Sequence, residues 1–111
     1  MSDRHHPPAN PDLPVHNLVI YIPKQGKEAE LLELLKKHEP AMRSVGLCTS
    51  EPFKLWKGFD IRKERTQYIE TFSWKDGRAP ELAHQTPEVM AVWESMGPVL
   101  EDLVILHVES L

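Results

Sequence analysis

The sequence predicts an α+β fold in which a four-stranded antiparallel sheet carries helices on one of its faces. Segments with strand character and segments with helical periodicity follow one another in the order β-α-β-β-α-β. The 111 residues are enough for one domain of common size, and they contain no internal repeat. Several strand segments carry apolar residues on both alternating faces, which is typical of strands that are covered on both sides.

The first strand is predicted over residues 15–22, which are rich in Val, Ile and Leu and end at a proline. Side chains of a strand point alternately to its two faces. One face therefore carries Val15, Asn17, Val19 and Tyr21, and the other carries His16, Leu18, Ile20 and Ile22. Because both faces are mostly apolar, we expect this strand to be covered on both sides.

The main helix is predicted over residues 26–45, where Leu31, Leu35, Met42 and Val45 recur at helical spacing. His38 occupies the position that completes this series, so its side chain is expected to point inward from the apolar stripe. Pro40 lacks a backbone donor and predicts a kink beside His38. His38 then either lines a pocket or is a histidine at the edge of the core, bonded to a backbone carbonyl.

Two further strands are predicted over residues 53–57 and 66–74, with a polar loop over 58–65 between them. One face of the second of these strands carries Tyr68, Glu70, Phe72 and Trp74. Glu70 is the polar member of an aromatic face, and a covered carboxylate must find donors or become protonated. Glu70 therefore marks either a functional site or a pair with a histidine or lysine of a neighbouring strand.

The remaining elements are a short helix over 79–85, a second helix that begins after Thr86, and a last strand over 103–109. Thr86 is expected to cap the second helix, with proline at its first position. His84 lies in the hinge between the two helices, and Trp93 lies in the apolar stripe of the second. Both side chains are expected to approach the sheet.

This order of elements is the ferredoxin-like, or split βαβ, pattern. An isolated chain of this type leaves one face of its sheet in water, yet these strands do not alternate cleanly between apolar and polar residues. We therefore expect a second copy of the chain to cover the open face in a homodimer.

Composition limits the partners of the chain. The net charge is −4 and no basic face emerges, so nucleic acid is not an expected partner. No segment approaches the roughly 20 apolar residues of a membrane span, and no membrane partner is expected. The lone Cys48 cannot form an intrachain disulfide, which favours a cytoplasmic location.

Residues 1–14 hold four of the ten prolines and are predicted to be a flexible tail ahead of a single domain over 15–111. His5 and His6 are adjacent in this tail, but two mobile imidazoles make a poor metal site. No cluster with the spacing of metal ligands occurs elsewhere, so we expect no metal.

Three segments carry a resemblance to a known family: VHNLVIYIPKQGKEAELLELLKKHEPAMRSVGL, then YIETFSWKD, then AHQTPEVMAVWESMGPVLED. Together they resemble the antibiotic-biosynthesis-monooxygenase-like family of the dimeric α/β-barrel superfamily, over roughly residues 15–109. The resemblance implies two ferredoxin-like protomers packed sheet to sheet into an α/β barrel. It also implies a pocket in each protomer between sheet and helices.

The superfamily contains cofactor-free monooxygenases of aromatic polyketides, haem-degrading enzymes and isomerases. The haem-degrading group uses an Asn, Trp and His triad, whose places here hold Val19, Ala83 and Trp93. All three depart from the triad, so the resemblance argues against haem degradation, and we expect no cofactor.

The sequence thus predicts a homodimeric protein with a pocket for a small hydrophobic or aromatic ligand. The resemblance favours a cofactor-independent monooxygenase-like enzyme acting on a small aromatic or enolisable compound. A non-catalytic ligand-binding module and a purely structural module remain alternatives. The candidate catalytic bases are His38 and His84, and the candidate substrate-binding residues are Glu70, Trp74, Trp93 and Tyr21.

Overall fold

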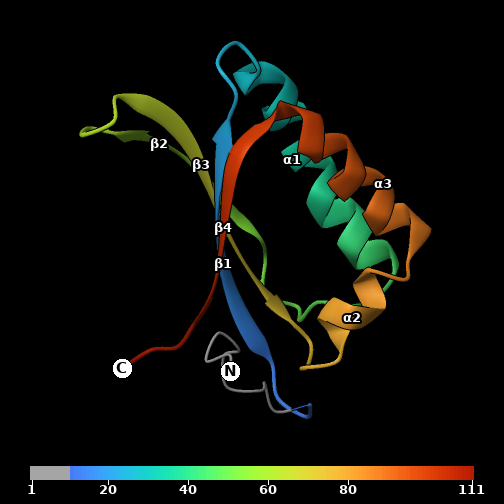
Figure 1. Cartoon of the computed structure of the whole chain (residues 1–111). Helices are drawn as coiled ribbons and strands as arrows, with labels where there is room; N and C mark the ends of the chain where they lie inside the picture. The colour runs from blue at the N-terminus through green and yellow to red at the C-terminus, as the bar shows by residue number, and fades with distance from the viewer. Residues whose placement is uncertain (1–10) are drawn as a thin grey trace, which may run out of the picture.

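The computed structural model describes residues 11–111, which follow the predicted order of elements (Figure 1). The elements are β1 (Val15–Pro23), α1 (Glu28–Ser44), β2 (Lys54–Asp60), β3 (Arg65–Trp74), α2 (Ala79–Ala83), α3 (Pro87–Met96), the 3₁₀ helix η1 (Gly97–Val99) and β4 (Leu100–Val108). Most of the predicted tail, with His5 and His6, lies outside the described residues.

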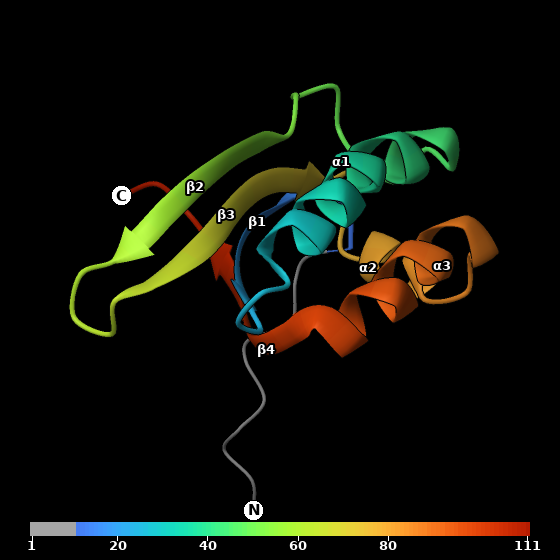
Figure 2. The same ribbon diagram turned by 90° about the horizontal axis from the view of Figure 1, so that it is seen from above.

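The four strands form one sheet in the order β2-β3-β1-β4, and every neighbouring pair is antiparallel. All three α-helices lie on one face of this sheet, and the opposite face is left open (Figures 1 and 2). The hairpin of β2 and β3 reaches out beyond the helices. This is the predicted ferredoxin-like architecture.

The core lies between the sheet and the helices. The faces predicted from alternation are confirmed. The predicted face of β1 that includes Tyr21 is buried, and so is the predicted face of β3 that includes Glu70. The main helix buries the predicted stripe against them, with Leu31, Leu35, His38 and Met42. The helix runs through Pro40 without ending there.

The helices cover the two central strands better than the two outer ones. One row of side chains on the helix-facing side runs across all four strands, through Leu55, Glu70, Val19 and Ile105. The inner two are 2% and 4% exposed, whereas Leu55 is 39% and Ile105 is 57% exposed. The sheet is therefore wider than the layer of helices, and openings remain beside β2 and beside β4.

The hairpin between β2 and β3 differs from its prediction as a polar loop over 58–65. The Asp60 carboxylate accepts hydrogen bonds from the backbone N–H groups of Arg62 and Lys63. The backbone carbonyl of Asp60 accepts one from the N–H of Glu64 at 2.7 Å. Glu64 adopts a positive φ of 53°. These bonds close a tight turn, so the strands extend further toward the tip than the apolar pattern indicated.

Two helix and strand ends also differ from the prediction. Thr86 occupies the N-cap position of α3, but its hydroxyl donates to the carbonyl of Leu82 at 2.8 Å instead of capping the helix. The last strand begins at Leu100 rather than at residue 103. It starts early because the N–H of Lys24 bonds the carbonyl of Val99 at 2.8 Å and aligns the two chain segments.

The open face of the sheet carries a row of apolar side chains in register across all four strands. This row consists of Trp56, Ile69, Ile20 and Val104. Leu106 and Val108 of β4 extend the apolar surface and are exposed in the single chain. No helix within residues 11–111 combines the length and the apolar character needed to cross a membrane.

Replacing Leu31 with alanine should lower the free energy of unfolding by about 2–5 kcal/mol, because Leu31 is fully buried in the core. Leu82→Ala is the matched control, since that leucine is 43% exposed, and its effect should stay within about 0.5 kcal/mol. Urea denaturation of both variants measures the difference. Equal effects would contradict the placement of Leu31.

Candidate functional site

A pocket of about 300 Å³ lies between the sheet and the helices, on the side of β4. Its floor comes from β1 and β3, and α1 and α3 form the wall opposite. Leu103, Ile105 and His107 of β4 line its outer side. Most of the surface is aromatic or aliphatic, as is usual for small-molecule sites, and the volume is at the lower end of their range.

The fold brings five of the six predicted site residues to this pocket. These five are Tyr21, His38, Trp74, His84 and Trp93. Glu70 does not line the pocket but lies behind His38. The five come from β1, α1, β3, the hinge after α2, and α3, so residues far apart in sequence share one cavity.

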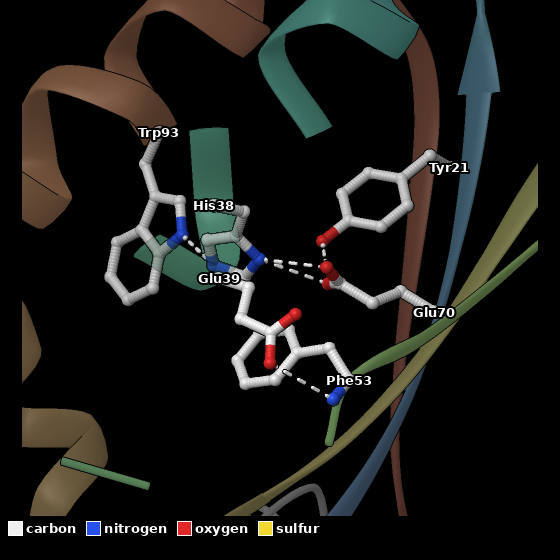
Figure 3. Close-up of polar contacts among 6 residues, drawn as sticks. All are labelled: Tyr21, His38, Glu39, Phe53, Glu70 and Trp93. Carbon is white, nitrogen blue, oxygen red and sulfur yellow. Dashed lines mark hydrogen bonds and ion pairs between the residues drawn. The ribbon is translucent and has the colours of Figure 1, made fainter. Parts of the chain in front are cut away.

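His38 is the polar centre of this arrangement, and its side chain is only 2% exposed. Its Nδ1 lies 3.0 Å from both carboxylate oxygens of Glu70, and its Nε2 lies 2.9 Å from Nε1 of Trp93 (Figure 3). An indole N–H can only donate a hydrogen bond. Nε2 must therefore be the acceptor, and the proton of the neutral imidazole sits on Nδ1 and is donated to Glu70.

The carboxylate of Glu70 is satisfied by two donors. The Tyr21 hydroxyl donates to Oε1 at 2.7 Å, and His38 donates from the other side (Figure 3). The histidine partner expected for Glu70 is thus present, but it comes from α1 and not from a neighbouring strand. The helix-facing side chains of β3 are buried against the helix layer, so the histidine partner of Glu70 comes from α1.

The pKa of Tyr21 is raised well above its ordinary value of 10.0. Burial is the largest cause, and the negative charge of Glu70 and its hydrogen bond raise the pKa further. The phenol therefore stays protonated at neutral pH and remains a donor to Glu70. Tyr21 also lines the pocket, so it joins the carboxylate to the pocket wall.

His84 lies near the solvent side of the pocket and is exposed. Its Nδ1–H donates to the carbonyl of Pro80 at 2.7 Å, because that oxygen can only accept. The imidazole centroid lies 4.9 Å from the ring of Trp93. His84 and His38 therefore both lie beside the indole of Trp93.

Asn17 is a pocket residue that the sequence did not single out. It is buried, and its Oδ1 has no hydrogen-bond partner among residues 11–111. A buried acceptor without a donor costs about 1–3 kcal/mol. The available signal was its position as the polar residue on the inward face of β1. A ligand that donates a hydrogen bond would satisfy this oxygen.

The described chain offers no alternative centre built on a metal or a thiolate. Within residues 11–111 no group of three or more His, Cys, Asp or Glu side chains is placed to hold a metal ion. Burial raises the pKa of the Cys48 thiol to about 11, so the thiol stays protonated near neutral pH.

A second hollow, of about 320 Å³, lies on the open side of the sheet. The Ser73 hydroxyl there donates to Glu51 at 3.1 Å and lies 2.6 Å from Nδ1 of His16. With its one proton given to the carboxylate, Ser73 must accept from His16, so the histidine is not placed as a base for this hydroxyl. The arrangement does not match that of an activated nucleophile.

No family model matches the sequence, and no curated protein matches it at a significant level. Comparison of structures does find relatives. An antibiotic biosynthesis monooxygenase is similar over 87% of this chain and 98% of its own, with 14% identity and a TM-score of 0.68. SnoaB, a cofactor-independent oxygenase from Streptomyces nogalater, is 12% identical over 88% of this chain and 95% of its own, with a TM-score of 0.67.

A dimeric ferredoxin-like protein of unknown function from Jannaschia is 14% identical over 87% of this chain and 99% of its own, with a TM-score of 0.69. The predicted resemblance to proteins of the antibiotic-biosynthesis-monooxygenase type is thus confirmed at the level of fold. At these identities the likeness concerns the fold alone, and the chemistry rests on the residues of this chain.

In an alkaline titration the phenolate of Tyr21 should form only well above pH 10, because its pKa is raised in the folded protein. The folded state holds this proton more tightly than the unfolded chain does. The corresponding stability is complete below pH 10.0 and is lost as the pH rises through the folded value. Ultraviolet difference titration of the wild type against Tyr21→Phe measures the step. A Tyr21 phenolate at pH 10 in folded protein would contradict the assignment.

Proposed function

We propose that this protein binds a small, flat aromatic or enolisable compound in the pocket and removes a proton from it, as a cofactor-independent oxygenase-like enzyme. The observation that carries the proposal is the orientation of His38. Its basic nitrogen, Nε2, faces Trp93 at the pocket, while Glu70 holds the proton on Nδ1. An imidazole held in one tautomer beside an apolar cavity is well suited to act as a general base.

His38 and Trp93 form a matched pair for a hydroxylated ligand. The indole N–H of Trp93 occupies the single lone pair of Nε2, at 2.9 Å. A ligand hydroxyl that takes this place donates to Nε2 and leaves the indole N–H free to donate to the ligand oxygen. The oxygen then gains negative charge beside a donor, which stabilises the anion as it forms.

The rest of the pocket favours the same class of ligand. Trp74 and Trp93 provide aromatic walls at a centroid distance of 6.5 Å, and flat rings pack well against such walls. The unpartnered Oδ1 of Asn17 supplies an acceptor for a second hydroxyl or an N–H group. A compound with one acidic hydroxyl or enol and a further donor fits these features.

The step after proton removal is supported by the relatives alone. An electron-rich anion can react with O₂ without a cofactor, because the anion itself provides the electrons. Addition of O₂ to an anionic carbon that still carries one hydrogen gives a peroxide, which takes up a proton. The O–O bond then breaks as that carbon loses its hydrogen, and water leaves with a carbonyl group in place. SnoaB is a cofactor-independent oxygenase with this fold, which supports the same class of reaction here.

A non-catalytic ligand-binding protein is the second candidate. The same pocket of about 300 Å³ supports it, and no residue of the site speaks against it. A structural dimer with a filled core is less favoured, because side chains do not fill this space. Ligand binding without turnover would distinguish the second candidate from the first.

We also propose that two copies of the chain associate through the open face of the sheet. The apolar row that includes Trp56 and Ile69 is left uncovered by the single chain, and Leu106 and Val108 add to it. A dimeric relative with the same fold supports this assembly. The cytoplasmic location and the absence of a nucleic-acid partner stay predictions from composition.

Replacing His38 with glutamine should abolish oxygen uptake with a panel of anthrones and quinols. Glutamine can still donate to Glu70 but cannot take a proton, so we expect a loss of about 100-fold or more. His84→Gln is the matched control and should retain most of the activity. An oxygen electrode measures turnover, and a thermal shift with a non-reacting naphthol measures binding.

Activity that is indifferent to the His38 change would overturn the assignment of the base. Binding of the naphthol without any turnover would favour the non-catalytic protein instead.

Replacing Leu106 with glutamate should convert the dimer to a monomer, because it buries a charge in the proposed interface. Leu82→Glu is a matched control, since both leucines are 43% exposed in the single chain but Leu82 lies on the helix side. Sedimentation at micromolar concentration reports the assembly state. A dimer that survives the Leu106 change would count against this interface.

A further inference from the structure

The hydrogen bond between His38 and Glu70 joins two separate openings of the molecule. His38 lines the pocket, and Glu70 does not. Glu70 instead lines a third cavity, of about 420 Å³ and here called the α1–β2 groove, which His38 does not line. His38 and Glu70 are therefore neighbours in the wall between the two cavities. His38 faces the pocket, and Glu70 faces the α1–β2 groove.

The register of the sheet explains this position. Glu70 of β3 lies directly between Val19 of β1 and Leu55 of β2. Val19 lines the pocket, and Leu55 lines the α1–β2 groove. Because the helices leave both outer strands partly uncovered, a carboxylate in the middle of this row has one opening on either side of its strand.

The groove is suited to hold water beside Glu70. Lys36, Glu39 and Arg43 of α1 line it with charged groups, and its volume is far larger than one water requires. Glu39 already accepts a hydrogen bond from Arg43 at 3.0 Å. It accepts another from the backbone N–H of Phe53 at 3.3 Å (Figure 3). The groove thus differs from the pocket in that charged side chains of α1 line part of it.

We propose that Glu70 and the α1–β2 groove form a proton route between His38 and solvent that bypasses the pocket. This proposal rests on the proposed function, in which His38 takes a proton from the ligand. It assigns Glu70 to proton transfer through His38, without contact between Glu70 and the ligand. The proton then leaves on the β2 side of β3, between sheet and helices, without crossing the pocket on the β4 side.

The transfer balances in three steps. The ligand gives its proton to Nε2 of His38 and keeps the electron pair as an anion. Nδ1 of His38 then gives its own proton to an oxygen of Glu70, 3.0 Å away, and the imidazole is neutral again with the proton on Nε2. Glu70 finally passes that proton to water in the groove and returns to a carboxylate.

The same steps run in reverse when an intermediate in the pocket needs a proton. Nε2 gives its proton to the intermediate, water in the groove protonates Glu70, and Glu70 restores the proton on Nδ1. The groups that face this route are Tyr21 from β1, Trp93 from α3, and the three charged residues of α1 in the groove. Tyr21 donates to Glu70 in both directions and holds the carboxylate in place.

Exchange of the His38 Nδ1 proton with water tests this route without a ligand, in acid-titrated protein in which Nε2 carries a proton and the imidazolium can give its Nδ1 proton to Glu70. Nuclear magnetic resonance of ¹⁵N-histidine-labelled protein, with magnetisation transfer from water, measures the exchange rate. The substitution Leu55→Trp should cover Glu70 from the side of the α1–β2 groove. We expect Leu55→Trp to slow the exchange by about 100-fold, the lower end of the contribution of a positioned proton-transfer group.

Leu103→Trp is the matched control, because Leu103 is 41% exposed and lines the mouth of the pocket, whereas Leu55 is 39% exposed and lines the groove. This change should leave the exchange rate within a small factor of the wild type. Glu70→Gln should slow exchange as Leu55→Trp does, because the amide accepts from Nδ1 but cannot carry the proton. The ¹⁵N shifts of His38 report whether its tautomer is retained.

Slower exchange in Leu103→Trp than in Leu55→Trp would overturn the proposal, since the proton would then leave through the pocket. Equal rates in all variants, or exchange too fast to detect even in Leu55→Trp, would overturn it as well. The measurement needs no ligand and no turnover. A failed substrate screen therefore counts against the proposed function and leaves this result standing, and the reverse also holds.

Discussion

The need to satisfy one buried carboxylate constrains the whole structure. Glu70 is 2% exposed, and an unpaired ion in such a place costs several kcal/mol. Its two donors, Tyr21 and His38, belong to β1 and α1, and His38 is itself held by Trp93 of α3. Four elements must therefore meet at one point before the carboxylate can be buried. The packing of the helix layer on the sheet and the geometry of the candidate site are fixed by the same contacts.

The pattern of the sequence predicted which faces these residues occupy. Alternation placed Glu70 on an aromatic face of its strand, and helical spacing placed His38 in an apolar stripe, and both side chains are buried as expected. Periodicity identifies a face but does not say which residue of another element lies opposite. The position of α1 along the sheet is decided by the packing of the whole core. The histidine partner considered for Glu70 was therefore expected on a neighbouring strand and lies on a helix, while Tyr21 of the neighbouring strand provides the other donor.

Features set by single polar atoms were the least predictable. The turn at Asp60 depends on one carboxylate oxygen that accepts two N–H groups, and Thr86 uses its hydroxyl for a carbonyl of the preceding turn. Each of these hydrogen bonds depends on the local backbone conformation. The sequence around it is compatible with more than one such conformation. The unpartnered oxygen of Asn17 is a further case, because the lack of a partner is a property of everything that surrounds it.

The fold explains why two polar side chains such as His38 and Glu70 can lie between the pocket and the α1–β2 groove. The fold does not require polar side chains at these positions. A four-stranded sheet is wider than the layer of helices above it, so exposed positions such as Leu55 and Ile105 remain at both flanks of the covered centre. In this chain one cavity lies beside β4 and another beside β2. The two spaces can exchange protons only where titratable side chains replace apolar ones in the central row and in the helix above it. His38 and Glu70 are that replacement here, and the side chains at these two positions, more than the architecture, decide which chemistry the pocket can support.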